Sequence, residues 1–417
     1  MRIGLAGAGR IGARHAETLR TLPGVDALVL ADADPERARA LGALLSARSG
    51  VAGAASGTTG AAAGAAGRGE GSPDTPRDAS RRGGVAGGAS TGGVGTAAGR
   101  ARGAAGAEGA GGVARAAGRP VGAAGGAEIV VEEAVDALFA PGAGLDGLVV
   151  AAATDAHADL VVRAVRAGMP VFCEKPLAGD LSGTVQVLAA IGDAPVQVGF
   201  QRRFDAGHRA VREAVASGRL GWIHTLRSCT FDPAPPPREY VPGSGGLFRD
   251  CGVHDYDAIR YVTGREVLQV MAVGANRGDA YFGEFGDVDT ATALLVLDDG
   301  TVATASASRY NAAGYDVRLE VFGSKDGVVA GLDEHTPLTP VGAPGPAAPY
   351  SGFLERFADA YDAELAAFVE LAAGRRDNPC PPAQALEAFL VAEACDLSRR
   401  RGGPVTIAEV RERAGIR

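Results

Sequence analysis

The sequence predicts an α/β protein with a doubly wound parallel sheet at its N-terminus and a second, α+β domain on an open, largely antiparallel sheet. Two observations predict this. Up to about residue 176, short apolar runs alternate with helix-length stretches, which is typical of a parallel sheet covered by helices. After about residue 200, several β-rich runs follow one another, and DDG at 298–300 indicates a hairpin turn. The 417 residues are enough for two domains, which we place at 1–176 and 177–417.

The strands and helices of the first domain are expected to alternate along the chain. We expect strands at 2–6, 27–31, 129–131, 148–152 and 171–173. A further strand is expected at 196–200, after the boundary at residue 176. We expect helices at 10–22, 35–47, 133–139 and 156–167. Pro35 fits the first turn of its helix, because a proline there loses no intrahelical hydrogen bond.

The second domain begins with a helix and continues mainly as strands. We expect a helix at 206–217, a strand at 222–229, a proline-rich loop (FDPAPPP, 231–237) and a helix running to about 263. Strands are expected at 267–275, 290–297, 301–309 and 316–322. The tail after about residue 353 holds two helical stretches, which are free to pack back on the first domain.

Residues 48–127 differ from the rest of the chain in composition. They contain no Leu, Ile, Met, Phe, Tyr or Trp, and their nine arginines exceed their four acidic residues by five charges. Such a segment buries too little apolar surface to offset the entropy lost on ordering. We expect a disordered insertion within the first domain, dispensable for activity. The alternative is a segment that makes weak contacts with an acidic partner.

The overall composition argues against several classes of protein. A net charge of −8 gives no basis for a nucleic-acid partner. No apolar run reaches eighteen residues, so we expect no membrane partner. The five cysteines are not spaced as a zinc site or a disulfide framework, so we expect no metal and assign the protein to the cytoplasm, where thiols stay reduced.

The motif GAGRIG (7–12) follows the first strand and opens a helix. Gly7 permits a tight turn, Gly9 lets the backbone approach a pyrophosphate, and Gly12 allows close packing of helix and strand. The helix N-terminus then faces the phosphates. This arrangement predicts a dinucleotide cofactor.

Asp32 lies twenty residues past Gly12, at the end of the second strand. A carboxylate there accepts the ribose hydroxyls and repels a 2′-phosphate, so we expect NAD rather than NADP. The nearby Arg37 leaves NADP open. The alternative role for Asp32 is a helix cap before Pro35.

Three further residues carry candidate chemistry. Lys175 follows the fifth strand, and ligands of such sheets lie at the carboxyl ends of the strands. Asp250 and His254 share one face if their segment is helical, which would make them a general base and its orienting carboxylate. The alternatives are a surface lysine and an incidental ion pair at a helix start.

These motifs together resemble the glucose–fructose oxidoreductase/inositol dehydrogenase (Gfo/Idh/MocA) family. The resemblance rests on GAGRIG, TDAHADL (154–160), EKPL (174–177) and the D-x-x-x-H at 250–254, and it spans the chain outside 48–127. A narrower resemblance, to the myo-inositol 2-dehydrogenases of that family, rests on FDPAPPPREY (231–240), GGLFRDCGVHDYDAIRYVTG (245–264) and GYDVRLEVFGS (314–324).

The resemblance implies a Rossmann domain and assigns a catalytic role to Lys175, Asp250 and His254. His254 would remove the hydroxyl proton as hydride leaves the carbinol carbon for the nicotinamide. Asp250 would orient the imidazole, and Lys175 would hold the reacting oxygen. A rate that rises toward alkaline pH, as His254 loses its proton, would follow.

The resemblance also implies two sets of binding residues. The implied cofactor contacts are Gly7, Gly9, Arg10, Ile11, Gly12, Asp32, Thr154, His157, Glu174 and Lys175, and the implied substrate contacts are Arg202 and Tyr315. His157 has a helix-start role as its alternative. One departure from the family is Cys251-Gly252-Val253, where bulkier residues are expected.

The function implied is NAD-dependent oxidation of a secondary alcohol of a cyclic polyol, with myo-inositol giving 2-keto-myo-inositol (scyllo-inosose). The family is often tetrameric through the second-domain sheet, so a homo-oligomer is expected. Three alternatives stay open. They are an NAD(P)-dependent dehydrogenase of another sugar or of scyllo-inositol, an NAD-binding protein without turnover, and a hydrolase that uses NAD transiently.

Overall fold

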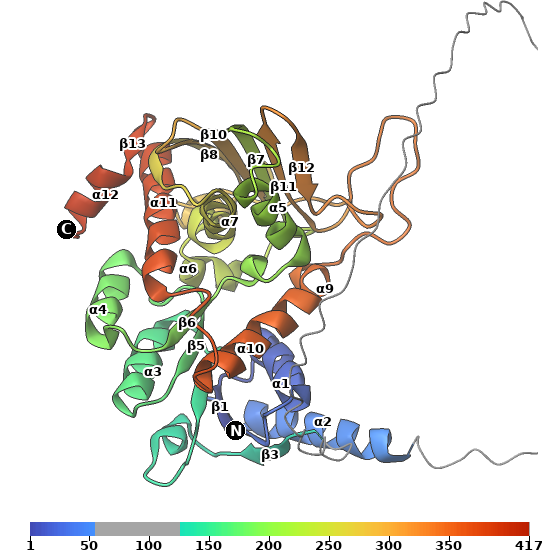
Figure 1. Ribbon diagram of the computed structural model, residues 1–417, viewed down its shortest axis with the longest axis vertical. Coiled ribbons are helices and arrows are strands. Elements are labelled where there is room, and N and C mark those ends of the chain that lie inside the picture. The colour runs from blue at the N-terminus through green and yellow to red at the C-terminus, as the bar shows by residue number, and fades with distance from the viewer. Residues whose placement is uncertain (55–125, 417) are drawn as a thin grey trace, which may run out of the picture. The chain divides into compact units, whose positions relative to one another are not determined.

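Two β-sheets organise the residues that the structure, a computed structural model, describes: 1–54 and 126–416 (Figure 1). The predicted insertion at 48–127 lies outside these residues, apart from its first seven and last two positions. That this segment is disordered and dispensable for activity therefore remains a prediction.

The first sheet has six parallel strands in the order β3-β2-β1-β4-β5-β6. Their bounds are β1 Arg2–Ala6, β2 Ala27–Ala31, β3 Glu128–Val131, β4 Gly147–Val150, β5 Val171–Glu174 and β6 Val196–Gly199. The strand order reverses between β1 and β4, which is where a doubly wound sheet opens a crevice for a ligand. The predicted fold class of this part of the chain is confirmed.

Helices on both sides of the first sheet bury its apolar strands. They are α1 Arg10–Thr21, α2 Pro35–Ala54, the 3₁₀ helix Val135–Phe139, α3 Thr154–Arg166 and α4 Leu181–Ile191. Helix α10, Ala358–Ala372, comes from the tail of the chain and packs Leu365 and Phe368 against Ile3 and Leu5 of β1. The N- and C-terminal parts of the chain thus share one core.

Some of the predicted helix bounds were wrong. Helix α2 continues to Ala54, seven residues beyond its predicted end. The helix expected at 133–139 is only a 3₁₀ turn. Helix α4 was not predicted, because its sequence, LSGTVQVLAAI, mixes glycine and β-branched residues of low helix propensity. Its start is fixed by Asp180, whose carboxylate caps the helix by accepting a hydrogen bond from the backbone N–H of Gly183.

The second sheet has seven strands in the order β12-β11-β7-β10-β9-β8-β13. Their bounds are β7 Ile223–Phe231, β8 Val267–Ala275, β9 Thr290–Leu297, β10 Val302–Ser308, β11 Asp316–Gly323, β12 Gly327–Ala330 and β13 Val405–Thr406. Every neighbouring pair is antiparallel except β7 and β10, which run parallel. This confirms the largely antiparallel sheet.

One face of the second sheet is covered by helices, and Figure 1 shows α7 and α11 lying against it. The helices of this part are α5 Ala206–Ala216, α6 Val241–Ser244, α7 Val253–Thr263, α8 Tyr281–Glu284, α9 Phe353–Arg356, α11 Pro382–Arg401 and α12 Ile407–Arg413. Strand β6 of the first sheet lies beyond residue 176, and the domain boundary placed there stays a prediction.

The stretch that carries Asp250 is not a uniform helix. Gly245 and Gly246 take left-handed φ values of 79° and 89°, and a π-helical turn spans Phe248–Gly252 before α7 begins. The π turn leads directly into α7, so the predicted helix is continuous to Thr263 but begins with a π turn.

The three glycines of GAGRIG have different surroundings. Gly7 has φ of +108°, and a Cβ there would lie 2.5 Å from the backbone of Ala151. A Cβ at Gly12 would lie 2.0 Å from the carbonyl oxygen of Gly7, so α1 and β1 could not approach as closely. A Cβ at Gly9 would have no atom within 4 Å. Two glycines thus serve packing, while the third leaves open space in front of the helix.

We predict that Gly12→Ala lowers the free energy of unfolding by about 1–3 kcal/mol, because an added methyl group overpacks the turn. Gly9→Ala is the matched control and should unfold at the urea midpoint of the unchanged protein. Equal midpoints for the two variants would contradict the packing role of Gly12.

Candidate active site

Lys175 links the two sheets at the carboxyl end of β5. Its side chain is 18% exposed, and its ammonium donates hydrogen bonds to the Asp250 backbone carbonyl at 2.9 Å and to the Asp250 carboxylate at 3.2 Å. The structure therefore brings together two of the three predicted catalytic residues, which are 75 positions apart in the sequence.

Asp250 accepts hydrogen bonds from three side chains on different elements. Besides Lys175, the Tyr240 hydroxyl donates at 3.1 Å and the Arg309 guanidinium at 2.8 Å. Burial alone would raise the pKa of Asp250, but the charges of Lys175 and Arg309 outweigh it and lower this pKa to about 2. Asp250 is thus a carboxylate at any pH near neutrality.

The predicted contact between Asp250 and His254 is not formed. Within 1–54 and 126–416, no hydrogen bond joins the two side chains, and Nδ1 of His254 is buried without a partner. The imidazole instead lies edge-on to the ring of Phe200, with 5.7 Å between ring centroids. The carboxylate of Asp250 is instead bonded to Lys175, Tyr240 and Arg309.

The surroundings of His254 favour a neutral imidazole. Loss of hydration, followed by the positive charges of Lys175 and Arg202, lowers its pKa well below the ordinary 6.5. A neutral imidazole is the form that can accept a proton. An imidazole that is neutral at neutral pH gives no reason for the expected rate increase toward alkaline pH.

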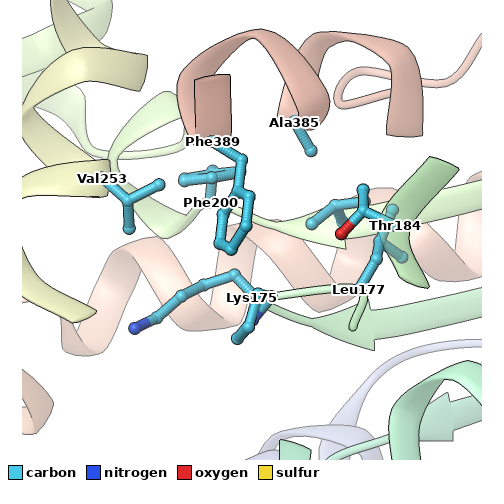
Figure 2. Close-up of a pocket in the computed structure, with 9 residues that line it drawn as sticks. Lys175, Leu177, Thr184, Phe200, Val253, Ala385 and Phe389 are labelled. Carbon is cyan, nitrogen blue, oxygen red and sulfur yellow. The ribbon is translucent and has the colours of Figure 1, made fainter. Parts of the chain in front are cut away.

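A small, largely apolar pocket lies beside the aliphatic part of Lys175. Figure 2 shows the lysine running below Phe200, with its nitrogen on the side of Val253 and away from Leu177. The remaining residues of the pocket wall are Pro176, Thr184, Val198, Ala385 and Phe389. This wall removes the lysine stem from water while its charged end reaches Asp250.

Arg202 and Tyr315, the predicted substrate contacts, are both buried. Arg202 is 2% exposed and donates to Asp255 at 2.8 Å and to Thr230 at 2.7 Å. Tyr315 packs in an apolar cluster with Phe357. Their placement favours a role in holding the core, so a direct contact with a polyol finds no support in this structure.

Asp32 contacts the glycine-rich loop. Its carboxylate accepts the backbone N–H of Ala8 at 2.6 Å and that of Asp34 at 2.8 Å. The second contact resembles the cap considered as an alternative, and the first ties β2 to the loop after β1. A ribose would therefore approach a carboxylate that is already oriented.

Two predicted cofactor residues, Glu174 and His157, are hydrogen-bonded to other residues of the protein. Glu174 accepts from Nε2 of the buried His15 on α1 at 2.7 Å. The ring nitrogens of His157 lie 2.7 Å from the carbonyl oxygen of Pro176 and 3.0 Å from that of Ala152. His157 thus holds the turn that carries Lys175, and its position favours a structural role.

The remaining predicted cofactor residues border the crevice. Thr154 is the first residue of α3, which follows β4. The Arg10 guanidinium lies over the Phe353 ring, 4.8 Å from its centroid, and Ile11 packs beside the Tyr315 cluster. Together with the open space at Gly9 and an N-terminus of α1 that no side chain caps, these residues fit a dinucleotide.

Three polar residues around Asp250 were not predicted: Tyr240, Asp232 and Arg309. Asp232 is the second residue and Tyr240 the last residue of the conspicuous FDPAPPPREY motif, so the motif pointed to them without giving their role. Arg309 had no local signal, because its contact with Asp250 depends on how the strands pair.

Three features of the described residues bear on location and cofactors. No helix among them is long and apolar enough to cross a membrane. They contain no group of three or more His, Cys, Asp or Glu that could hold a metal ion. All five cysteines, including Cys395 on α11, are free and buried.

The lowered pKa of His254 predicts a pH-dependent stability. A histidine whose pKa is depressed in the folded state stabilises the fold fully above the unfolded pKa of about 6.5 and loses this contribution as pH falls. We expect the free energy of unfolding to drop more between pH 7 and pH 5 than in His254→Gln, by on the order of 1 kcal/mol. Denaturant titrations at both pH values measure this difference. Equal losses of unfolding free energy in the unchanged protein and in His254→Gln would show that folding does not lower the pKa of His254.

Two sequence-family profiles match the chain. One, described as an oxidoreductase family with an NAD-binding Rossmann fold, matches residues 108–201. The other, described as the GFO/IDH/MocA C-terminal domain, matches residues 208–329. The two matches adjoin near η2, Gln201–Arg203, which follows the last strand of the first sheet.

Individual proteins are similar to the chain as well. A relative named myo-inositol dehydrogenase Hyg17, from Streptomyces leeuwenhoekii, is 42% identical over 57% of this chain and 72% of its own length. The crystal structure of a putative myo-inositol dehydrogenase from Sinorhizobium meliloti has a TM-score of 0.72 and 28% identity, covering 98% of this chain and 99% of that one. A scyllo-inositol dehydrogenase from Lactobacillus casei, with bound NAD(H) and scyllo-inositol, has a TM-score of 0.69 and 25% identity, covering 98% and 99%. The chain belongs to the GFO/IDH/MocA family of oxidoreductases, and its first sheet is the NAD-binding Rossmann fold of that family.

Proposed function

We propose that this protein oxidises a secondary hydroxyl of a cyclic polyol with NAD, and that its substrate is myo-inositol, which becomes 2-keto-myo-inositol. The observation that carries the proposal is the ion pair of Lys175 with Asp250 at the carboxyl end of β5, with His254 near enough for the charge of Lys175 to help lower its pKa. The similarity to the Streptomyces myo-inositol dehydrogenase supports the choice of substrate.

The chain's own residues account for the proton in this reaction. Bound NAD supplies the acceptor for the hydride. The imidazole of His254 accepts the hydroxyl proton as the C–H bond breaks and the C=O bond forms. The ammonium of Lys175 donates a hydrogen bond to the oxygen, where negative charge develops, and Asp250 holds that ammonium in place.

The residues that would hold the cofactor are those around the β1–α1 turn. The uncapped N-terminus of α1 and the space in front of Gly9 suit a pyrophosphate. Asp32 suits the ribose and disfavours a 2′-phosphate, which supports NAD over NADP. The exclusion of NADP and the cytoplasmic location stay predictions.

A second candidate substrate is scyllo-inositol. The similar Lactobacillus casei structure holds that isomer together with NAD(H). The two isomers differ in one hydroxyl orientation, and the residues described around Lys175 do not discriminate between them. A panel of polyols therefore has to include both.

The test is the absorbance of reduced nicotinamide when NAD is mixed with each polyol. We expect reduction with myo-inositol, slower reduction with some pyranose sugars and little with short linear alcohols, because a site built to bind many hydroxyls is left with unpaired polar groups by a simpler substrate. Reduction with an aldose or a short alcohol, but with no inositol, would leave only the family assignment.

The same assay tests the proposed base. His254→Ala should lower kcat by about 10²–10⁴ while NADH binding, followed by fluorescence, is kept. His224→Ala is the matched control, because His224 is exposed and bonds only Thr225 among the described residues. Near-normal turnover of His254→Ala would refute its assignment as the base.

We infer that the protein forms a homo-oligomer through the uncovered face of the second sheet, and the family resemblance suggests a tetramer. Met271, Val273, Leu294 and Val302 expose 36–61% of their surface. They lie on three neighbouring strands, with Met271 opposite Leu294 in the register of β8 and β9. An apolar sheet face of this kind is suited to the same face of a second copy.

Light scattering after size-exclusion chromatography tests this inference. Leu294→Glu should reduce the measured mass to that of a smaller assembly, because it places a charge within the proposed interface. Leu338→Glu is the control, since Leu338 is 56% exposed outside the sheet. A monomeric unchanged protein would exclude the interface.

A further inference from the structure

Arg309 occupies a buried position between two carboxylates. It follows β10 directly and is 4% exposed. Its guanidinium donates to Asp250 at 2.8 Å, to Asp232 at 3.1 Å and to the sulfur of Cys251 at 2.9 Å. The small side chain of Cys251, which departs from the bulkier residue expected there, leaves room for this contact.

The pairing of β7 with β10 creates this arrangement. These two strands are the parallel pair of the second sheet, and their last residues, Phe231 and Ser308, are in register. The next residue on each strand, Asp232 and Arg309, therefore comes to the same edge of the sheet. The backbone bond from Asp232 N–H to the Ser308 carbonyl, 2.9 Å long, continues the pairing to this point.

The four charges at this edge balance one another. Lys175 and Arg309 are cations, and Asp232 and Asp250 are anions. Without Arg309, two carboxylates would share one ammonium, and each would raise the pKa of the other. The oxygen of Asp250 that accepts from Arg309 would lose that donor, and the carboxylate could rotate away from Lys175.

We propose that Arg309 is a positioning residue: it fixes the Asp250 carboxylate in the orientation that holds the Lys175 ammonium against the hydroxyl to be oxidised. This role rests on the proposed function, since it acts through Lys175. The competing explanation is a buried ion pair that only stabilises the fold. The two differ in what happens to the ionisation of Asp250 and to kcat when the guanidinium is replaced.

Arg309→Gln tests the proposal in the full-length protein. Small displacements of a catalytic group cost on the order of 10² in rate, so we expect kcat to fall by about that factor while NADH affinity is kept. Arg309→Lys, which keeps the charge, should recover part of the loss. Arg249→Gln is the matched control, because Arg249 is on the same π turn and pairs with Glu393 and Asp396.

The pH dependence separates positioning from folding. The charged and titratable groups that face Asp250 are Lys175, Arg309, Tyr240, Asp232 and the thiol of Cys251. In Arg309→Gln the pKa of Asp250 rises, so the rate should fall more steeply from pH 8 to pH 5 than in the unchanged protein. The double variant with Arg309→Gln and Asp250→Asn should lack this steeper loss of rate between pH 8 and pH 5. A lower kcat with an unchanged pH profile would overturn the proposal.

A measurement without substrate tests the role of Arg309 independently of the proposed reaction. The carbon-13 carboxyl resonance of Asp250, identified by its loss in Asp250→Asn, should stay that of a carboxylate down to pH 4 in the unchanged protein and begin to titrate above pH 4 in Arg309→Gln. If no inositol reduces NAD, the proposed function fails but this shift is still expected. If the resonance does not move in Arg309→Gln, Arg309 does not control Asp250. Should Arg309→Gln not fold, Arg309→Lys gives the same readout with a smaller expected shift.

Discussion

The ion pair between Lys175 and Asp250 is the contact on which the site depends. Lys175 directly follows β5 of the first sheet, and Asp250 lies in a π turn packed against the second. A carboxylate and an ammonium withdrawn from water are stable only when both are well bonded. Arg309 and Tyr240 complete the bonding of Asp250, so two elements of the second part of the chain fix the position of a residue in the first.

A second set of buried charges fixes the helix that carries His254. Arg202 and Arg203 are consecutive residues before α5, and they pair with Asp255 and Asp257 of α7 at 2.8 and 2.6 Å. Removing one partner of such a pair leaves an uncompensated charge, which costs about 3–5 kcal/mol. Helix α7 therefore has little freedom to rotate about its axis. His254, one residue before the first of these aspartates, is fixed with it.

Local sequence patterns predicted the strands that consist of an apolar run or of alternating apolar and polar residues. The apolar runs of β1 and β2 and the alternating strands β8 and β9 were found with their observed ends. Helix α4 and the π turn were not found, for different reasons. The first has residues of low helix propensity, whereas no local pattern in the sequence distinguished the π turn from an α turn. Spacing singled out Asp250 and His254 but assigned Asp250 the wrong partner. Arg309 could not be predicted, because its contact follows from the parallel pairing of β7 with β10.

The pairing of Asp250 with Lys175 rather than with His254 suggests how the proton of the substrate hydroxyl is removed. In a serine hydrolase, a carboxylate bonded to the histidine stabilises the imidazolium that forms. Here that carboxylate serves Lys175 instead, and burial, together with the charges of Lys175 and Arg202, lowers the pKa of His254. Such an imidazole is a weak base, so proton transfer from a hydroxyl has to be assisted at the oxygen. In the mechanism that we propose, the Lys175 ammonium supplies that assistance, because it stabilises the negative charge on the oxygen as the proton leaves. On this argument the lysine contributes more to activating the hydroxyl than the histidine does, and Asp250 acts on the reaction through the lysine.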